Sequence, residues 1–208
     1  MDVIACGDDA LRILCGPGGV RHDLAAHLST SPCWINVVPG KQDVTAAFDP
    51  HVLSMEAARA LLLNALETGP GTVQREARVH SLEVQYAGPD GPDLAQIAEH
   101  LGLTEEAVIK SVEGSELSVD MLGFTPGFAY LTGLDPALVA ARLVHPRPRV
   151  PAGSVGLITG QIGLYALDGP GGWPIIGRVQ QGLFDRTAAD PFLLRAGDRV
   201  VLRRKAGA

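Results

Sequence analysis

The sequence predicts an α+β protein made of a small α/β sandwich followed by a β-barrel. Its first part alternates short strands with two helical segments, and a Gly/Pro-rich turn separates this part from the rest. Its later part crowds glycine, proline and aromatic residues between short apolar runs, which is typical of a barrel with many tight turns. We expect the first domain at residues 1–86 and the second at 87–208.

Local patterns predict each element of the first domain. The clearest helix begins at Ser54, which can cap it, while Glu56 suits its positive end and an apolar stripe runs from Ala58 to Leu66. Residues 78–86 alternate apolar and polar side chains, as a half-buried strand does. The order strand, helix, hairpin, helix, strand predicts a ferredoxin-like sandwich with an extra N-terminal strand. In chain order, the elements are expected at 3–5, 10–14, 20–29, 34–38, 44–48, 54–68 and 78–86.

The second domain should begin after the turn formed by residues 88–92. Asp93 is expected to cap a helix over 94–101, and Thr104 a second helix, because both side chains can accept hydrogen bonds from first-turn N–H groups. Many short strands should then close a barrel, with the apolar strand 199–202 as the last of them.

The composition is that of an ordinary globular protein, with 208 residues, 46% hydrophobic and 19% charged. A net charge of −6 disfavours nucleic acid as a partner, because a polyanion would be repelled. No apolar run approaches the ~20 residues of a transmembrane helix, and no signal-peptide pattern is present, so we expect a soluble, cytoplasmic protein without a membrane partner. The three cysteines lack CxxC spacing and are expected to be reduced and mostly buried.

Standard catalytic and metal-binding signatures are missing from the chain. The patterns GxxxxGK[ST], HExxH and GxSxG do not occur, and the six histidines show no metal-ligand spacing. We therefore expect no tightly bound metal, although Mg²⁺ carried by a nucleotide would leave no motif.

The segment Thr125-Pro126-Gly127-Phe128 fits a type II turn, in which Pro126 sets φ and Gly127 supplies a positive φ. Two interpretations stay open. The turn can be a structural corner whose neighbouring aromatic residues, Phe124 among them, pack into the core. It can also form the rim of a binding pocket, with Phe124, Pro126 and Gly127 as candidate lining residues.

Two arginines stand within the proline-rich segment 145–151, which cannot be helical because its prolines hold it extended. In a β-like extension Arg147 and Arg149 point the same way, and two forked guanidinium groups suit a carboxylate or a phosphate. The alternative is a pair of surface arginines that bond backbone carbonyls. Arg178 is a further but weaker candidate for binding a carboxylate or a phosphate.

Three glycine-rich loops follow the arginines, at 152–156, 160–163 and 169–172. Such loops can present backbone N–H groups to an anion, or they can be plain hairpin turns. Their clustering beside the arginines favours a binding role, for which the candidates are Gly160, Gln161, Gly171 and Gly172.

Taken in order, these motifs resemble the KipI family, which is also described as allophanate hydrolase subunit 1 or as the B component of 5-oxoprolinase, and which contains subdomains C and D of a carboxyltransferase domain. The resemblance covers about the last 120 residues strongly and the N-terminal part only in layout. The matching motifs are GPDL at 91–94, GF-x-PGF-x-YL at 123–131, PR-x-x-VPAGSVG at 148–156 (loose at its start), GQ-x-G-x-Y at 160–165, PGGW-x-x-IGR at 170–178, LFD at 183–185 and LL-x-x-GD-x-V at 193–200.

The resemblance implies a cyclophilin-like barrel and a subunit that works with a larger homologous partner. Together with a third protein, this pair would open 5-oxoproline to glutamate with ATP and Mg²⁺, and Arg147, Arg149 and Arg178 would hold carboxylate or phosphate. Family members that inhibit a sensor histidine kinase provide an alternative, as do allophanate- or urea-type amide hydrolase subunits.

The chain departs from the family pattern at four places. Ser111 stands near the position of a usual histidine, the aromatic residue usual after that helix is replaced near Glu116-Leu117, Ile162 replaces a threonine, and Ala166 replaces a proline. If the histidine or the threonine contributes polar contacts in other members, this chain lacks them, and a changed substrate is one consequence.

Overall fold

The computed structural model describes residues 2–16, 20–68 and 77–206, which belong to two compact units. The division falls after Glu76, not after residue 86 as predicted, so the second unit runs from Ala77 to Ala208. The mixture of helices, an open sheet and a closed barrel confirms the α+β class.

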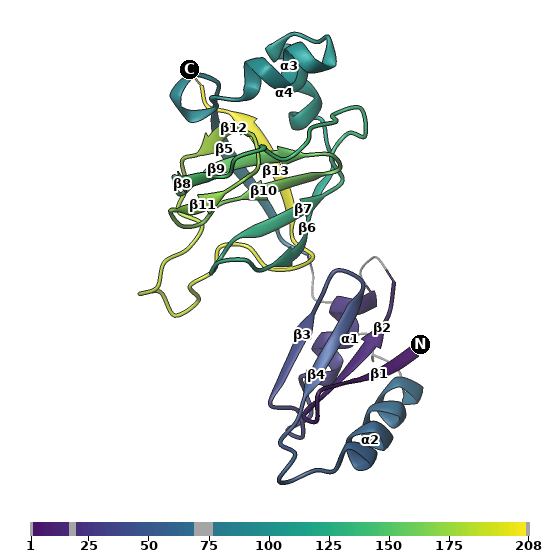
Figure 1. Ribbon diagram of the computed structural model, residues 1–208. Helices are drawn as coiled ribbons and strands as arrows, with labels where there is room; N and C mark the ends of the chain where they lie inside the picture. The colour runs from purple at the N-terminus through teal and green to yellow at the C-terminus, as the bar shows by residue number, and fades with distance from the viewer. Residues whose placement is uncertain (1, 17–19, 69–76, 207–208) are drawn as a thin grey trace. The chain divides into compact units, whose positions relative to one another are not determined.

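The N-terminal unit is a four-stranded antiparallel sheet with two helices (Figure 1). The strand order β1-β2-β4-β3 is the order of a ferredoxin-like sheet, but the N-terminal strand β1 takes the edge position for which we expected residues 78–86. The elements are β1 (Asp2–Cys6), β2 (Ala10–Leu14), α1 (Val20–Leu28), β3 (Asn36–Pro39), β4 (Asp43–Ala47) and α2 (Met55–Thr68).

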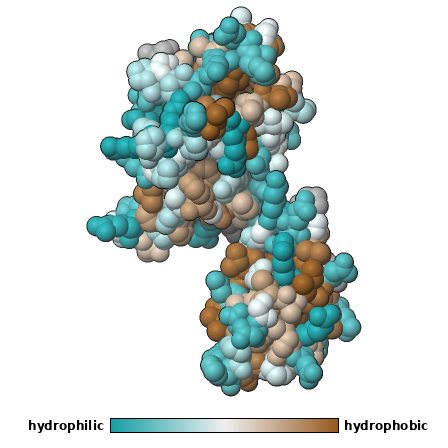
Figure 2. All heavy atoms as spheres, in the orientation of Figure 1, coloured by the Kyte–Doolittle hydropathy of each residue, from teal (hydrophilic) through white to brown (hydrophobic). Residues whose placement is uncertain are grey.

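Helix α2 forms as the sequence predicts. The Ser54 hydroxyl accepts a hydrogen bond from the Ala57 N–H at 3.2 Å, which caps the first turn. Ala58 and Leu62 are fully buried against the sheet, whereas Leu61 is 45% exposed, so the buried stripe is narrower than expected. Hydrophobic side chains reach the surface of this unit (Figure 2), and its exposed large apolar residues are Ile4, Leu14, Val20, Ile35, Val38, Val52, Leu61 and Leu63.

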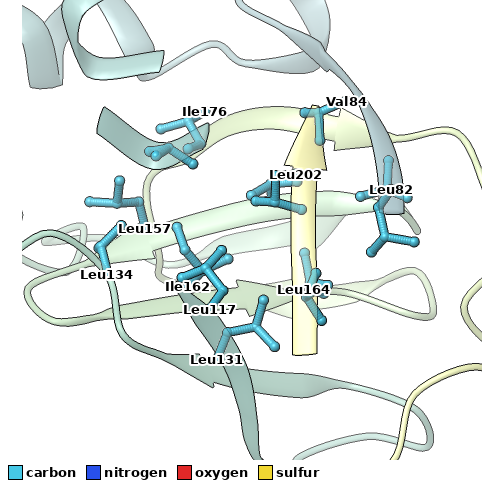
Figure 3. Packing of buried hydrophobic residues seen from close by; sticks show 14 of the residues in the cluster. Leu82, Val84, Leu117, Leu131, Leu134, Leu157, Ile162, Leu164, Ile176 and Leu202 are labelled. Atoms are coloured by element: carbon cyan, nitrogen blue, oxygen red, sulfur yellow. The ribbon is translucent and has the colours of Figure 1, made fainter. Parts of the chain in front are cut away.

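The C-terminal unit contains a closed barrel in the strand order β10-β7-β6-β13-β5-β12-β9. Its interior is filled by aliphatic side chains from all around the barrel (Figure 3). A separate two-stranded ribbon pairs β8 with β11. The strands are β5 (Val79–Tyr86), β6 (Leu117–Leu122), β7 (Ala129–Thr132), β8 (Arg147–Val150), β9 (Ser154–Ile158), β10 (Gln161–Leu164), β11 (Gly169–Gly171), β12 (Ile175–Val179) and β13 (Arg199–Arg204).

Strand β5 belongs to the barrel, which corrects the prediction that it closes the first domain. It pairs in parallel with β13, from Val79 opposite Arg199 to Val84 opposite Arg204, and antiparallel with β12. The local alternation identified the strand correctly, but alternation does not tell which sheet the strand joins.

Two helices and a short 3₁₀ turn complete the unit, with α3 and α4 together at one end of the barrel (Figure 1). The Thr104 hydroxyl caps α4 by accepting a bond from the Ala107 N–H at 3.1 Å, as predicted. Asp93 precedes α3 but makes no capping bond, and its carboxylate lies elsewhere. These elements are η1 (Gly88–Asp90), α3 (Leu94–Leu101) and α4 (Glu105–Glu113).

The structure also bears on the expectations that the cysteines are mostly buried and that the chain has no transmembrane helix. Cys6, Cys15 and Cys33 are all free thiols, but Cys6 is exposed and the other two only half-buried, so the expected burial is wrong. Within the residues that the structure describes, no helix has the length and apolar character needed to cross a bilayer.

Candidate functional site

Two small pockets border the β8–β11 ribbon, and most of the predicted site residues line one or the other. We call the first the aromatic pocket, with a volume of about 210 Å³, and the second the arginine pocket, with about 200 Å³. The aromatic pocket is lined by Phe124, Phe128, Tyr130, Arg142, Pro146, Tyr165, Pro170, Gly171, Gly172 and Trp173. The arginine pocket is lined by Pro89, Asp90, Pro92, Arg147, Arg149, Val150, Pro151, Ser154, Ile175 and Arg178.

Phe128 is the centre of the aromatic pocket. Its ring centroid lies 4.7 Å from that of Tyr130, 4.9 Å from Tyr165 and 6.1 Å from Trp173. The last two contacts are edge-to-face, at interplanar angles of 86° and 87°, an arrangement that ring quadrupoles favour. One wall of the pocket is therefore a cluster of aromatic rings packed against one another.

Glycines make this ring cluster possible by leaving space beneath it. A Cβ at Gly163 would lie 2.8 Å from both Phe128 and Trp173, and a Cβ at Gly171 would lie 2.4 Å from the Tyr165 hydroxyl oxygen. Both distances are shorter than any tolerable contact. Gly163 and Gly171, which belong to two of the glycine-rich segments, thus accommodate aromatic side chains.

The segment from Phe124 to Phe128 combines both interpretations of the predicted turn. The Phe128 N–H donates to the Thr125 carbonyl at 3.1 Å and Gly127 has φ 77°, which confirms the turn. Phe128 is buried, whereas Phe124 is 61% exposed and has φ 71°, a left-handed value that is strained for a bulky residue. Phe124 therefore forms the pocket rim, while Pro126 and Gly127 are not among its lining residues.

Arg142 lines the aromatic pocket and was not predicted from the sequence. Its guanidinium carbon lies 5.8 Å from the centroid of the Trp173 ring, a cation–π geometry. Among the residues that the structure describes, no carboxylate pairs with it. Arg142 also borders a larger groove of about 540 Å³ between α3 and residues 139–144.

Two phenols complete the polar groups of the aromatic pocket. Burial raises the pKa of Tyr130 and of Tyr165 above the ordinary value, and the positive charge of Arg142 opposes that rise. Both phenols are therefore protonated at neutral pH and can donate hydrogen bonds.

The arginine pocket brings together Arg147, Arg149 and Arg178, the three arginines singled out from the sequence. Strand β8 is extended, as its prolines predict, and both of its arginines line the same pocket. Each of the three guanidinium groups faces an aspartate, however. The three aspartates therefore offset the positive charge that the three arginines bring to the pocket.

Arg147 is held most firmly, by Asp93. Its two terminal nitrogens donate to the two Asp93 carboxylate oxygens at 2.7 and 2.8 Å, and the Ile175 N–H donates to the same carboxylate at 2.6 Å. The hydrogen bond to Asp93 raises the pKa of Arg147 further. Since Asp93 is buried, this pair fixes the position of β8 beside α3 and β12.

The other two pairs are more exposed and more easily exchanged. Arg149 donates to Asp168 at 2.5 and 3.1 Å, and the side-chain exposures are 77% and 45%. A hydrogen bond from the Ala152 N–H at 2.7 Å, together with Arg149, holds the pKa of Asp168 below its usual range. Arg178 lies 3.3 Å from Asp90. Exposed pairs contribute little stability, so a ligand anion can replace either aspartate.

Two predicted lining residues lie elsewhere. Gly160, with φ 76°, and Gln161 form the hairpin end between β9 and β10, where Gln161 pairs with Ile158. Neither lines the aromatic or the arginine pocket. Both residues therefore belong to the hairpin that these two strands form.

The departures from the family pattern also lie outside the two pockets. The Ser111 hydroxyl donates to Asp135, which joins α4 to the chain after β7. Ile162 is fully buried in the barrel core, so its apolar side chain contributes packing. Ala166 is buried as well.

Comparison with known proteins shows what the chain is similar to. Residues 18–194 match the family described as carboxyltransferase domain, subdomain C and D. A protein of Escherichia coli O157:H7, named as the B component of 5-oxoprolinase, is 39% identical over 178 residues, which cover 85% of this chain and 81% of the relative. A protein of the same name from Bacillus subtilis (strain 168) is 34% identical over 212 residues, covering 93% and 88%.

A solved structure shows the same fold within a longer chain. The crystal structure of TTHA0988 is similar with a TM-score of 0.81 and 35% identity. The similarity covers 96% of this chain but only 40% of the TTHA0988 chain, so this chain spans about two fifths of that protein.

Proposed function

Because this chain belongs to the family of carboxyltransferase domains, subdomain C and D, we propose that it is the B component of a 5-oxoprolinase-type complex, which opens 5-oxoproline to glutamate. The observation that carries this proposal is the identity of 39% and 34%, over most of both chains, to two proteins named as that component of 5-oxoprolinase. The aromatic pocket, small and lined by rings, suits a ligand of that size.

The proposed reaction is an ATP-dependent lactam hydrolysis. A lactam carbonyl is a poor electrophile, so its oxygen would first attack the γ-phosphorus of ATP, and the bond to ADP would break. Water would then add to the activated carbon, and the C–N bond would break to give the free amine and an acyl phosphate. A second water would release phosphate and leave glutamate.

Such a reaction needs positioning and positive charge more than a nucleophilic side chain. We assign Arg149 and Arg178 to the developing phosphate charge, because their aspartate partners are exchangeable. Arg147 is assigned a positioning role, since Asp93 already occupies its donors. Gly171 and Gly172 line the aromatic pocket, to which we assign the ring of the substrate.

ATP with Mg²⁺ is proposed as the co-substrate. Ligands of that size need more than the ~300 Å³ at which ordinary ligand sites begin, so neither small pocket holds a whole nucleotide. The groove of about 540 Å³ next to Arg142 offers more room, and a partner subunit would complete the site.

The free thiols suit the reducing environment of the cytoplasm, which we propose as the location of the protein.

The partner is proposed to be the larger homologous subunit. In TTHA0988 the matching region is joined to a further three fifths of one chain, which supports a tight association of two parts. Exposed apolar side chains on the N-terminal unit offer surface for such a contact (Figure 2).

Co-expression tests the proposal. The chain is produced with its larger homologue and the third protein, the complex is purified, and ADP release is measured with and without 5-oxoproline. We expect a stable complex whose ADP release depends on 5-oxoproline. A stable complex without that dependence would contradict the substrate, and failure to form any complex would contradict the proposed role as a component of the enzyme.

A further inference from the structure

We propose that Arg142 and the aromatic pocket bind a small flat ring that carries a carboxylate, with the Arg142 guanidinium on the carboxylate and the rings around the ligand. The identification of that ring as 5-oxoproline rests on the proposed function. The binding site itself, a ring slot with one cationic anchor, rests on the geometry of the pocket alone.

The first argument is charge. Four arginines stand near the β8–β11 ribbon, and three of them are paired with aspartates. Arg142 is the exception among the described residues, because its guanidinium lies over the face of Trp173 instead. A cation–π contact holds the guanidinium plane while leaving its N–H donors available for a carboxylate.

The second argument is shape. A volume of about 210 Å³ lies below the range of drug-sized ligand sites, so the pocket suits a single small ring. Aromatic rings line the pocket, Phe124 and Trp173 among them, and the Pro170-Gly171-Gly172 segment lines it without a bulky side chain. A flat, partly apolar ring matches these surfaces better than an extended flexible chain does.

The third argument is that the pocket offers polar groups that can bond to the ligand ring. Tyr130 and Tyr165 line the same pocket as Arg142, and both phenols are protonated at neutral pH. A ring that carries a carbonyl oxygen as well as a carboxylate can thus accept from a phenol at one side and from Arg142 at the other.

The fourth argument is the exposed ring of Phe124 at the rim of the aromatic pocket. Phe124 keeps a left-handed backbone and an exposed ring, although both features cost free energy. Its ring lies 5.5 Å from that of Phe128 in an edge-to-face contact. An exposed aromatic residue held in this way extends the ring-binding surface to the mouth of the pocket.

A fluorescence titration tests the proposal on the full chain. The substitution Trp34→Phe leaves Trp173 as the sole tryptophan, so its emission reports on the pocket. We expect a saturable change with 5-oxoproline and a much weaker response to 2-pyrrolidinone, which has the same ring without the carboxylate. Arg142→Ala should weaken 5-oxoproline binding about ten- to a hundredfold, whereas the exposed Arg203→Ala should leave it unchanged.

Several results would overturn the proposal. These are no saturable response to 5-oxoproline, equal binding of the two compounds, or equal effects of Arg142→Ala and Arg203→Ala. Where Trp34→Phe fails to fold, calorimetric titration of the unmodified chain and of Arg142→Ala gives the same comparison. A carboxylate-dependent affinity that Arg142→Lys partly restores would support the anchor role.

The pocket assignment and the proposed function can fail separately. If the complex releases ADP with 5-oxoproline but Arg142→Ala leaves the KM for 5-oxoproline unchanged, the pocket assignment is wrong and the function stands. If the wild-type complex is inactive with 5-oxoproline while the free chain binds ring carboxylates through Arg142, the pocket assignment stands and the function is wrong.

Discussion

Asp93 and Arg147 form an ion pair with two hydrogen bonds, at 2.7 and 2.8 Å, that joins the residue before α3 to the first residue of β8. The Ile175 N–H donates to the same carboxylate, so three segments of the barrel unit meet at one buried aspartate. This contact sets where the β8–β11 ribbon lies, and therefore where both pockets lie.

Removal of this carboxylate should destabilise the protein. Asp93→Ala leaves a partly buried guanidinium and a backbone N–H without their acceptor, and we expect the free energy of unfolding to fall by about 2–4 kcal/mol. The matched control is Asp168→Ala, whose exposed pair with Arg149 should contribute much less to the free energy of unfolding. Urea unfolding followed by circular dichroism measures both, and equal losses would contradict the positioning role.

The backbone conformation at Phe124 predicts that the protein tolerates the replacement of this residue by glycine. Glycine adopts a φ of 71° without strain, so Phe124→Gly should change the free energy of unfolding by no more than about 1 kcal/mol despite the loss of a whole ring. Phe128→Ala removes a fully buried ring from the same segment and should cost about 3–5 kcal/mol. Thermal unfolding of the two variants compares them, and a large loss for Phe124→Gly would show that its ring is a core residue.

Tyr86 should limit stability at high pH. Burial raises its pKa well above the ordinary value near 10, and its hydroxyl oxygen has no hydrogen-bond partner among the described residues. The folded state favours the neutral phenol, so this contribution to stability is complete below the unfolded pKa and is lost as the pH rises above it. Tyr86→Phe should raise the free energy of unfolding by up to about 2 kcal/mol at neutral pH.

The difference between Tyr86→Phe and the parent chain should widen between pH 9 and pH 11. Chemical unfolding at both pH values tests this. A constant difference would mean that the phenol ionises as easily in the folded chain as in the unfolded one.

Arg149 gives a prediction about turnover. Because its side chain is 77% exposed, Arg149→Ala should leave the fold and its unfolding temperature unchanged. If Arg149 stabilises phosphate charge in the transition state, ADP release by the complex should fall about a hundredfold or more. Arg203→Ala is the control at another exposed arginine of the same unit. Unchanged turnover in Arg149→Ala would remove it from the catalytic assignment.

Local signals explain which parts of the fold the sequence could predict. Ser54 and Thr104 cap their helices as expected, because a cap involves residues only three positions apart. The alternation of side chains predicts strand β5 correctly but not its sheet, since its parallel partner β13 begins at Arg199, far along the chain. No local pattern encodes such a pairing.

The candidate site shows the same limit. The arginine-rich and glycine-rich motifs stand out in the sequence because their residue types are unusual at close spacing, and several of their residues line the two pockets. Asp93 looked like a helix cap, and only the folded chain shows that its acceptors serve Arg147 and Ile175. Arg142 carries no sequence signal of its own, because its importance depends on the distant Trp173 and on the pairing of the other arginines.

The most direct test of the proposed role in 5-oxoproline hydrolysis is reconstitution of the complex with and without this chain. Glutamate and ADP are measured together after addition of ATP, Mg²⁺ and 5-oxoproline to the purified partners. We expect glutamate and ADP to form in equal amounts when the chain is present, and neither to form at an appreciable rate when it is left out. Partners that produce glutamate at the same rate without this chain would contradict that role.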